Sequence, residues 1–141
     1  MILPLVLIDT GPLVALADKG QKEAHKKSVA AVRQLSGSLI TTWPCLTEAL
    51  YFLHGLCGWQ GQRALLEYVN QQELVVHSPQ TDELLRIYAL MEQYQDTPMD
   101  FADASLVSLA ELRGARRILT MDSDFYIYRI NGTESFDVTR L

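Results

Sequence analysis

The sequence predicts an α/β protein, a three-layer α/β/α sandwich around a mostly parallel sheet of four to five strands. Short apolar runs of strand length recur along the chain, and longer segments with apolar residues at helical spacing lie between them. The first run, PLVLI at residues 4–8, does not alternate with polar residues, which is typical of a strand covered on both faces. Strands that alternate with helices in this way form parallel βαβ units.

Local sequence features place the elements of the first half. Gly37 follows a helical apolar stripe, and Pro44 suits the first turn of a helix that Thr42 or Trp43 begins. The elements expected here are a strand at 4–8, helices at 11–18 and 21–35, a strand at 39–42 and a helix that starts at Pro44.

The second half continues the alternation. Ser78 or Thr81 is expected to cap a helix, and Gly114 is expected to end one in the left-handed conformation. The expected elements are helices at 61–72, 80–95 and 100–113 and strands at 74–77, 117–120 and 136–139.

Composition indicates one globular domain over residues 1–141. The chain is 48% hydrophobic and 21% charged, which excludes disorder and supplies a substantial core. The net charge of -5 argues weakly against non-specific binding to nucleic acid. Basic residues are unevenly placed, however, with all four lysines within residues 19–27 and three arginines within residues 113–117.

The apolar N-terminal run is better explained as a buried strand than as a signal peptide. No basic residue precedes it, and it ends at Asp9. No stretch approaches the roughly 18 apolar residues of a membrane helix. Cys45 and Cys57 have neither metal-site nor redox-pair spacing, so we expect free thiols in a reducing compartment and a cytoplasmic protein with no membrane association.

Acidic residues recur where strands end and helices begin. Asp9 follows the first strand, Asp122 and Asp124 follow the strand at 117–120, and Asp100 and Asp103 begin the helix before that strand. A helix packed antiparallel to its following strand puts its N-terminus beside the strand's carboxyl end. We therefore expect these acids at the sheet edge where α/β proteins bind ligands.

Glu48 belongs with this set. It is the only Asp, Glu, Lys or Arg between Arg33 and Arg63, and it lies early in an apolar helix, so it needs a partner in space.

Each acid also has an ordinary structural explanation. Asp100 and Asp103 can cap a helix, at about 0.3–1 kcal/mol each. Asp9, Asp122 and Asp124 can be turn residues, and Glu48 can lie on the surface.

Taken together, the acids indicate a metal site. Two carboxylates about 5 Å apart repel by roughly 3 kcal/mol at an effective dielectric constant near 20. A group of them must therefore be protonated or bind a cation, and oxygen ligands without nearby His or Cys favour Mg²⁺ or Mn²⁺. One or two such ions can activate water and hold a phosphodiester for in-line attack.

Four segments resemble, in order, the motifs of PIN-domain ribonucleases, especially the VapC-type toxins: LIDTGPLVALAD, TTWPCLTEAL, DFADASLVSLAE and ARRILTMDSDF. The resemblance spans nearly the whole chain and implies a single PIN-like domain with an α/β/α fold. It also implies Mg²⁺- or Mn²⁺-dependent cleavage of RNA, a small antitoxin protein as partner, and a homodimer.

The resemblance assigns roles to individual residues. The catalytic and metal-binding acids would be Asp9, Glu48, Asp103 and Asp122. Thr10 and Thr120 resemble hydroxyl residues that support this site in the family. Asp100, one turn before Asp103, is expected to be accessory, and Asp124, outside the family pattern, either binds an outer water or has no role. Lys22, Lys26, Arg116 and Arg117 are candidates for steering the substrate, while His25 is either a solvated helix residue or a phosphate contact.

Other protein classes fit less well. The D-x-D of haloacid-dehalogenase-like phosphatases is missing because position 11 is Gly, and no lysine after Lys27 can serve as the late lysine of a receiver domain. No G-x-G-x-x-G follows a strand, which argues against dinucleotide binding. A PIN-like nuclease that is not a toxin, and a PIN-like module that only binds RNA or protein, stay open.

Overall fold

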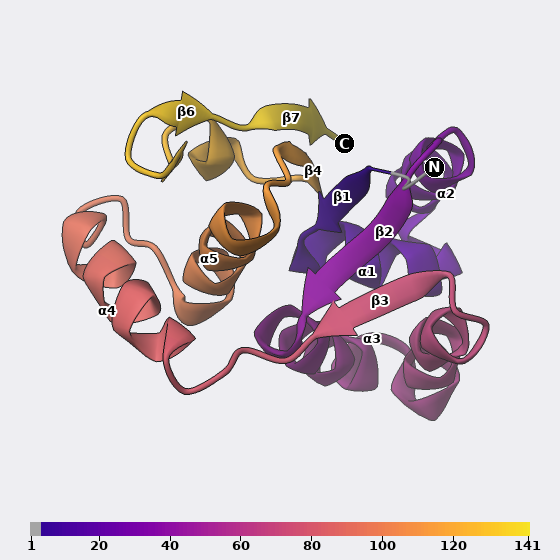
Figure 1. Cartoon of the computed structure of the whole chain (residues 1–141). Helices are drawn as coiled ribbons and strands as arrows, with labels where there is room; N and C mark the ends of the chain where they lie inside the picture. Colours follow the sequence, from indigo (N-terminus) through magenta and orange to yellow (C-terminus); the bar gives the residue numbers. More distant parts are fainter. Residues whose placement is uncertain (1–3) are drawn as a thin grey trace.

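The computed structural model describes residues 4–141 and contains a five-stranded sheet in the order β3-β2-β1-β4-β7 (Figure 1). Every neighbouring pair in this sheet is parallel. The predicted fold class is therefore confirmed. The strands are β1 Leu5–Ile8, β2 Ser38–Thr42, β3 Leu74–His77, β4 Arg117–Thr120 and β7 Asp137–Arg140.

Helices cover both faces of the sheet. The strand order runs outward from β1 to β3 and then returns to β4, so right-handed crossovers put the first three helices on one face and the last two on the other. In agreement, α1 packs against α2 and α3, and α4 packs against α5 (Figure 1). The helices are α1 Thr10–Ala17, α2 Glu23–Arg33, α3 Trp43–Asn70, α4 Glu83–Gln93 and α5 Phe101–Arg113.

The core lies between the sheet and these helices. β1 is its centre, with Leu7 and Ile8 fully buried. Along α5 every residue from Ala102 to Ala110 is buried, and the helix ends at Gly114 in the left-handed conformation, as predicted. Both N-terminal acids of α5 are therefore held at a fixed place on the carboxyl edge of the sheet. None of the helices in residues 4–141 combines the length and apolar character that a membrane span requires.

Three local features differ from the sequence prediction. The helices expected from Pro44 and over 61–72 are two halves of α3, joined at Gly58, where φ of 64° and ψ of -151° break the helical path. Neither Ser78 nor Thr81 caps α4; instead the Glu83 carboxylate accepts hydrogen bonds from the Gln80 N–H and from His77.

The third difference is a short antiparallel hairpin of β5 Arg129–Ile130 and β6 Glu134–Ser135, which precedes the last strand. Two-residue strands are too short to give a periodic pattern, so the sequence did not indicate them.

Candidate active site

Asp9 is held rigidly at the end of β1. Its Oδ1 accepts a 2.8 Å hydrogen bond from the Thr10 N–H, and its Oδ2 accepts one of 2.8 Å from the Thr120 hydroxyl. Its own N–H donates to the Leu119 carbonyl of β4 at 3.0 Å. The side chain is only 7% exposed. Both carboxylate oxygens are thus oriented by neighbours before any ligand binds.

Asp103 enters the same site from the first turn of α5. The Asp103 N–H donates to Asp100 Oδ1 at 2.7 Å, and Asp103 Oδ2 in return lies 3.5 Å from the Asp100 N–H, which makes a capping box. The Tyr128 hydroxyl donates to the same Oδ2 at 3.1 Å. Asp103 is 8% exposed. The helix start therefore places a buried carboxylate beside the end of β1.

Asp122 completes the group from the end of β4. Its N–H donates to Thr120 Oγ1 at 2.9 Å, and its Oδ1 accepts from the Asp124 N–H at 2.9 Å, which caps the short 3₁₀ turn Ser123–Tyr126. Thr120 therefore donates to Asp9 and accepts from Asp122, and it fixes the spacing of these two acids.

One carboxylate oxygen from each of Asp9, Asp103 and Asp122 lies within 4.8 Å of the other two. The three acids line a cavity of about 590 Å³, which we call the acidic pocket. Glu48 and Asp100 line it as well, and no Lys, Arg or His side chain is among its described lining residues. Three oxygen donors at this spacing with no cation beside them fit a hard divalent ion such as Mg²⁺ or Mn²⁺.

Burial and mutual repulsion keep protons on these acids. Burial, opposed by its hydrogen bonds to Thr10 and Thr120 and aided by the Asp122 charge, raises the pKa of Asp9 to about 6. Burial and the charges of Asp100 and Asp9 raise the pKa of Asp103 to about 8. The acids therefore favour a partner with positive charge, and a proton takes that role when no metal ion is present.

Comparison with known proteins gives the family. The model of the PIN domain family matches residues 6–131. The chain belongs to the PIN domain family. No curated protein sequence matches the chain.

Solved structures share the fold. VapC20 of Mycobacterium tuberculosis, described as a Sarcin-Ricin loop cleaving toxin, has a TM-score of 0.77 at 18% identity over 84% of this chain and 91% of its own. A toxin–antitoxin complex from Klebsiella pneumoniae scores 0.64 at 18% identity, covering 85% and 89%. VapBC2 from Rickettsia felis, bound to a DNA fragment from its promoter, scores 0.66 at 11% identity, covering 97% and 98%.

Glu48 lies in the acidic pocket of this PIN domain but outside the cluster of three acids. It projects from the second turn of α3 and is half-buried. Thr10 begins α1, and its buried hydroxyl has no hydrogen-bond partner among the described residues. Asp124 does not line the pocket; burial and the Asp122 charge raise the pKa of its half-buried carboxyl.

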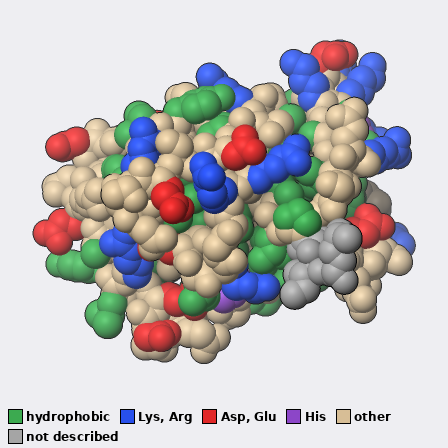
Figure 2. Space-filling model, turned by 45° about the horizontal axis from the view of Figure 1, so that its top comes forward, with side chains coloured by type: hydrophobic (Ala, Val, Ile, Leu, Met, Phe, Trp, Pro, Cys, Tyr) green, Lys and Arg blue, Asp and Glu red, His purple; other side chains and the backbone are tan. Residues whose placement is uncertain are grey.

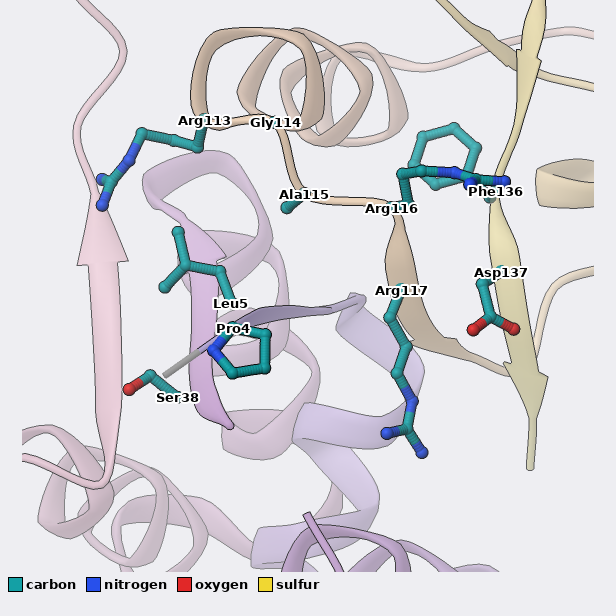
Figure 3. A pocket seen from close by; sticks show the side chains of 10 residues that line it. All are labelled: Pro4, Leu5, Ser38, Arg113, Gly114, Ala115, Arg116, Arg117, Phe136 and Asp137. Atoms are coloured by element: carbon teal, nitrogen blue, oxygen red, sulfur yellow. The ribbon is translucent and has the colours of Figure 1, made fainter. Parts of the chain in front are cut away.

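Two of the four basic residues expected near the substrate lie at the edge of the sheet opposite the acidic pocket. Arg117 begins β4 and Arg116 immediately precedes it, so the length of the strand, about 10 Å, separates them from the edge that carries Asp122. They line a separate cavity of about 1080 Å³, in which the guanidinium groups of Arg113, Arg116 and Arg117 point in different directions (Figure 3).

Arg116 is also held by its own chain, since it donates to the Ser135 carbonyl at 3.2 and 3.3 Å. Basic and acidic side chains are interspersed over the described part of the face in Figure 2, which gives a polyanion no continuous basic surface there. We therefore leave Arg116 and Arg117 out of the proposed substrate site.

The other basic residues lie on or just before α2. Lys22 is exposed at the start of α2, next to Gln21, which lines the pocket. Lys26 is exposed and pairs with Glu23 at 3.7 Å. His25 donates to the Ala15 carbonyl through Nδ1 at 2.7 Å, so it joins α2 to α1 and is half-buried, not fully solvated.

Sequence reasoning missed Tyr128, which donates a hydrogen bond to Asp103 from the core. Its ring is fully buried and meets the rings of Tyr94 and Phe125 edge-on, with centroids 5.1 Å apart in each pair. A tyrosine among other aromatic residues looks like a core residue in sequence. Only the hydrogen bond to Asp103 distinguishes it.

Proposed function

We propose that this PIN domain is a Mg²⁺- or Mn²⁺-dependent endoribonuclease and the toxin of a VapBC-type toxin–antitoxin pair. The observation that carries the proposal is the convergence of Asp9, Asp103 and Asp122, from three distant segments, to within 4.8 Å of one another. The fold similarity to VapC proteins, one of them described as a toxin that cleaves the Sarcin-Ricin loop, supports RNA as the substrate.

Asp9, Asp103 and Asp122 would hold the ion, and Glu48, which lines the same pocket, would complete its surroundings. When bound, a divalent ion neutralises charge on the scissile phosphate and activates water for attack on phosphorus. The Thr120 hydroxyl and the Thr10 N–H keep both oxygens of Asp9 in place throughout. Lys22, beside the pocket, is the basic residue that we propose for substrate contact.

Protonation of Asp9 and Asp103 competes with binding of the metal ion. With pKa values of about 6 for Asp9 and about 8 for Asp103, these two acids together retain a proton near neutral pH when no metal ion is bound. A cation must displace it, because ligands bind metal in their deprotonated form. The Tyr128 hydroxyl favours the charged form of Asp103 by donating to it.

The test is an RNA cleavage assay with Mg²⁺, Mn²⁺ or EDTA. Asp9→Asn removes a ligand charge but keeps an oxygen that can accept the Thr120 hydrogen bond, so we expect loss of cleavage with an unchanged circular dichroism spectrum. Glu48→Gln should also abolish cleavage. Asp137→Asn, an exposed acid at the opposite edge, is the matched control and should cleave normally. Cleavage by Asp9→Asn at the wild-type rate would discard the site.

An antitoxin partner and a homodimer are part of the proposal. Structural neighbours include toxin–antitoxin complexes, and the described surface has many large exposed apolar side chains, Leu85 and Tyr88 among the most exposed. A short neighbouring gene for a small DNA-binding protein whose product suppresses cleavage would separate a toxin from another PIN nuclease. Free thiols at Cys45 and Cys57 support a reducing, cytoplasmic location.

A further inference from the structure

A second cleft, with aromatic walls, adjoins the acidic pocket. Its volume is about 770 Å³, and we call it the aromatic cleft. Trp43 and Tyr51 line it from α3, Phe101 lines it from the start of α5, and Pro79 lines it from the loop after β3. Trp43, Thr47 and Tyr51 are spaced by four residues, so they share one face of α3.

The aromatic cleft and the acidic pocket share two lining residues. Glu48 and Asp100 line both cavities and so form the boundary between them. A polynucleotide whose scissile phosphate lies over Asp9, Asp103 and Asp122 must place flanking nucleotides on the walls that lead away from the pocket. One of those walls is the aromatic cleft.

Its three aromatic rings are all exposed to solvent. The exposed fraction is 49% for Trp43, 75% for Tyr51 and 44% for Phe101. Rings that face solvent beside a reaction site offer flat apolar surfaces for stacking, and base–aromatic stacking tolerates any base because every base has a π-face.

The charges of the aromatic cleft favour an uncharged flat group over a phosphate. No Lys, Arg or His is among its described lining residues, and its two charged residues, Glu48 and Asp100, are acids. A phosphate would be repelled by them. The hydroxyls of Thr47 and Ser78 lie in the same lining and offer hydrogen bonds to the polar edge of a base.

We propose that the aromatic cleft binds an unpaired nucleobase of the RNA substrate, next to the scissile phosphate, by stacking on Trp43 and its neighbouring rings. This inference rests on the ribonuclease function proposed above. It adds that the bound base lies outside any helical stack, because the faces of a base within a helix are covered by its neighbours and cannot stack on Trp43.

The two tryptophans of the chain allow a direct test. Trp59 is 59% exposed, comparable to Trp43, but it lines neither cavity, so it is the matched control. Trp59→Phe leaves Trp43 as the only tryptophan, and Trp43→Phe leaves Trp59. Each protein is titrated with a pool of short single-stranded RNAs in Ca²⁺, and a gel confirms that the RNA stays intact.

We expect bound RNA to quench the fluorescence of Trp43 and to leave that of Trp59 unchanged. Trp43→Ala should weaken RNA binding by about 5- to 150-fold, whereas Trp59→Ala should bind as the wild type does. Trp43→Phe keeps a ring and should retain most of the affinity. RNA with abasic sites should bind the wild type more weakly than intact RNA by a similar factor. If Trp43→Ala does not fold, Tyr51→Ala takes its place.

Several results would overturn the inference and leave the ribonuclease intact. In each case the wild type still cleaves RNA. The overturning results are that it binds abasic and intact RNA equally well, that the folded Trp43→Ala protein binds RNA as tightly as the wild type, or that the fluorescence of Trp43 is not quenched at saturating RNA. The aromatic cleft would then be assigned to apolar side chains of a protein partner. If the wild type cleaves no RNA with any divalent ion, the proposed function and this inference fall together.

Discussion

Replacing Asp103 with asparagine should stabilise the metal-free protein, and the gain should grow with pH. The folded-state pKa of Asp103 is about 8, well above the value near 3.9 in an unfolded chain. Between these values the folded state holds a proton that the unfolded state has released, so the wild type loses stability as pH rises from about 4 to about 8. Asparagine has no charge to bury and removes this loss.

The size of the effect follows from the pKa shift. A shift of one pKa unit corresponds to about 1.4 kcal/mol, so about four units set a ceiling of about 5–6 kcal/mol above pH 8. Water at the mouth of the pocket screens the charge of Asp103, so the actual effect on the free energy of unfolding is smaller than this ceiling. Asparagine can still accept from Tyr128 but weakens the capping box, at a cost of about 1 kcal/mol.

We therefore expect Asp103→Asn to gain about 2–4 kcal/mol over the wild type when pH is raised from about 5 to about 8.5. This corresponds to roughly 6–12 °C in melting temperature for a chain of this size. The measurement is denaturant and thermal unfolding in EDTA at both pH values. Asp137→Asn controls for the loss of one negative charge from an acidic protein and should show no such trend.

A stability difference that does not change with pH would refute the reasoning, because it would mean that Asp103 has the same pKa in the folded and unfolded states, as a well-solvated carboxyl does. A loss above about 2 kcal/mol at every pH would identify Asp103 as a structural cap whose carboxylate is required for the start of α5.

Three further predictions concern the metal site and α3. Calorimetric titration should show Mn²⁺ affinity rising from about pH 5 to about pH 8 with proton release, because Asp9 and Asp103 must lose protons to bind it; an affinity independent of pH would contradict their raised pKa values. Tyr128→Phe should shift the rise in Mn²⁺ affinity to higher pH, because it removes the hydrogen bond that favours charged Asp103. It should also lower the free energy of unfolding by about 0.5–1.5 kcal/mol. An unchanged pH midpoint would exclude a role of Tyr128 in tuning Asp103. Gly58→Ala should lower the free energy of unfolding by about 1 kcal/mol or more because its φ is 64°, whereas Gly55→Ala, at an open helical position, should raise it by about 0.5–1 kcal/mol; equal effects would mean that the break in α3 is not required.

The fold and the edge that carries the site were predictable for a specific reason. Apolar runs identified the strands, and parallel topology then required residues after β1 and β4, and at the start of α5, to meet. Asp9, Asp103 and Asp122 do meet, and Asp100 forms the cap that its position suggested.

Arg116 shows where the same reasoning stopped. It is close to Asp122 in sequence, but the strand between them carries it to the opposite edge of the sheet. The position of a residue within its element, and not its distance along the chain, decided whether it could reach the acidic pocket.

The sequence by itself determined the alternation of strands and helices and the gathering of acids at one edge, because both depend on periodicity and on chain direction. Tertiary structure alone decided which acids hold a proton, that Tyr128 supports Asp103, and that aromatic rings of α3 and α5 form a cleft beside the acidic pocket. These properties depend on desolvation and on short distances between residues far apart in the chain, such as Asp9 and Thr120. Local sequence patterns do not predict such distances.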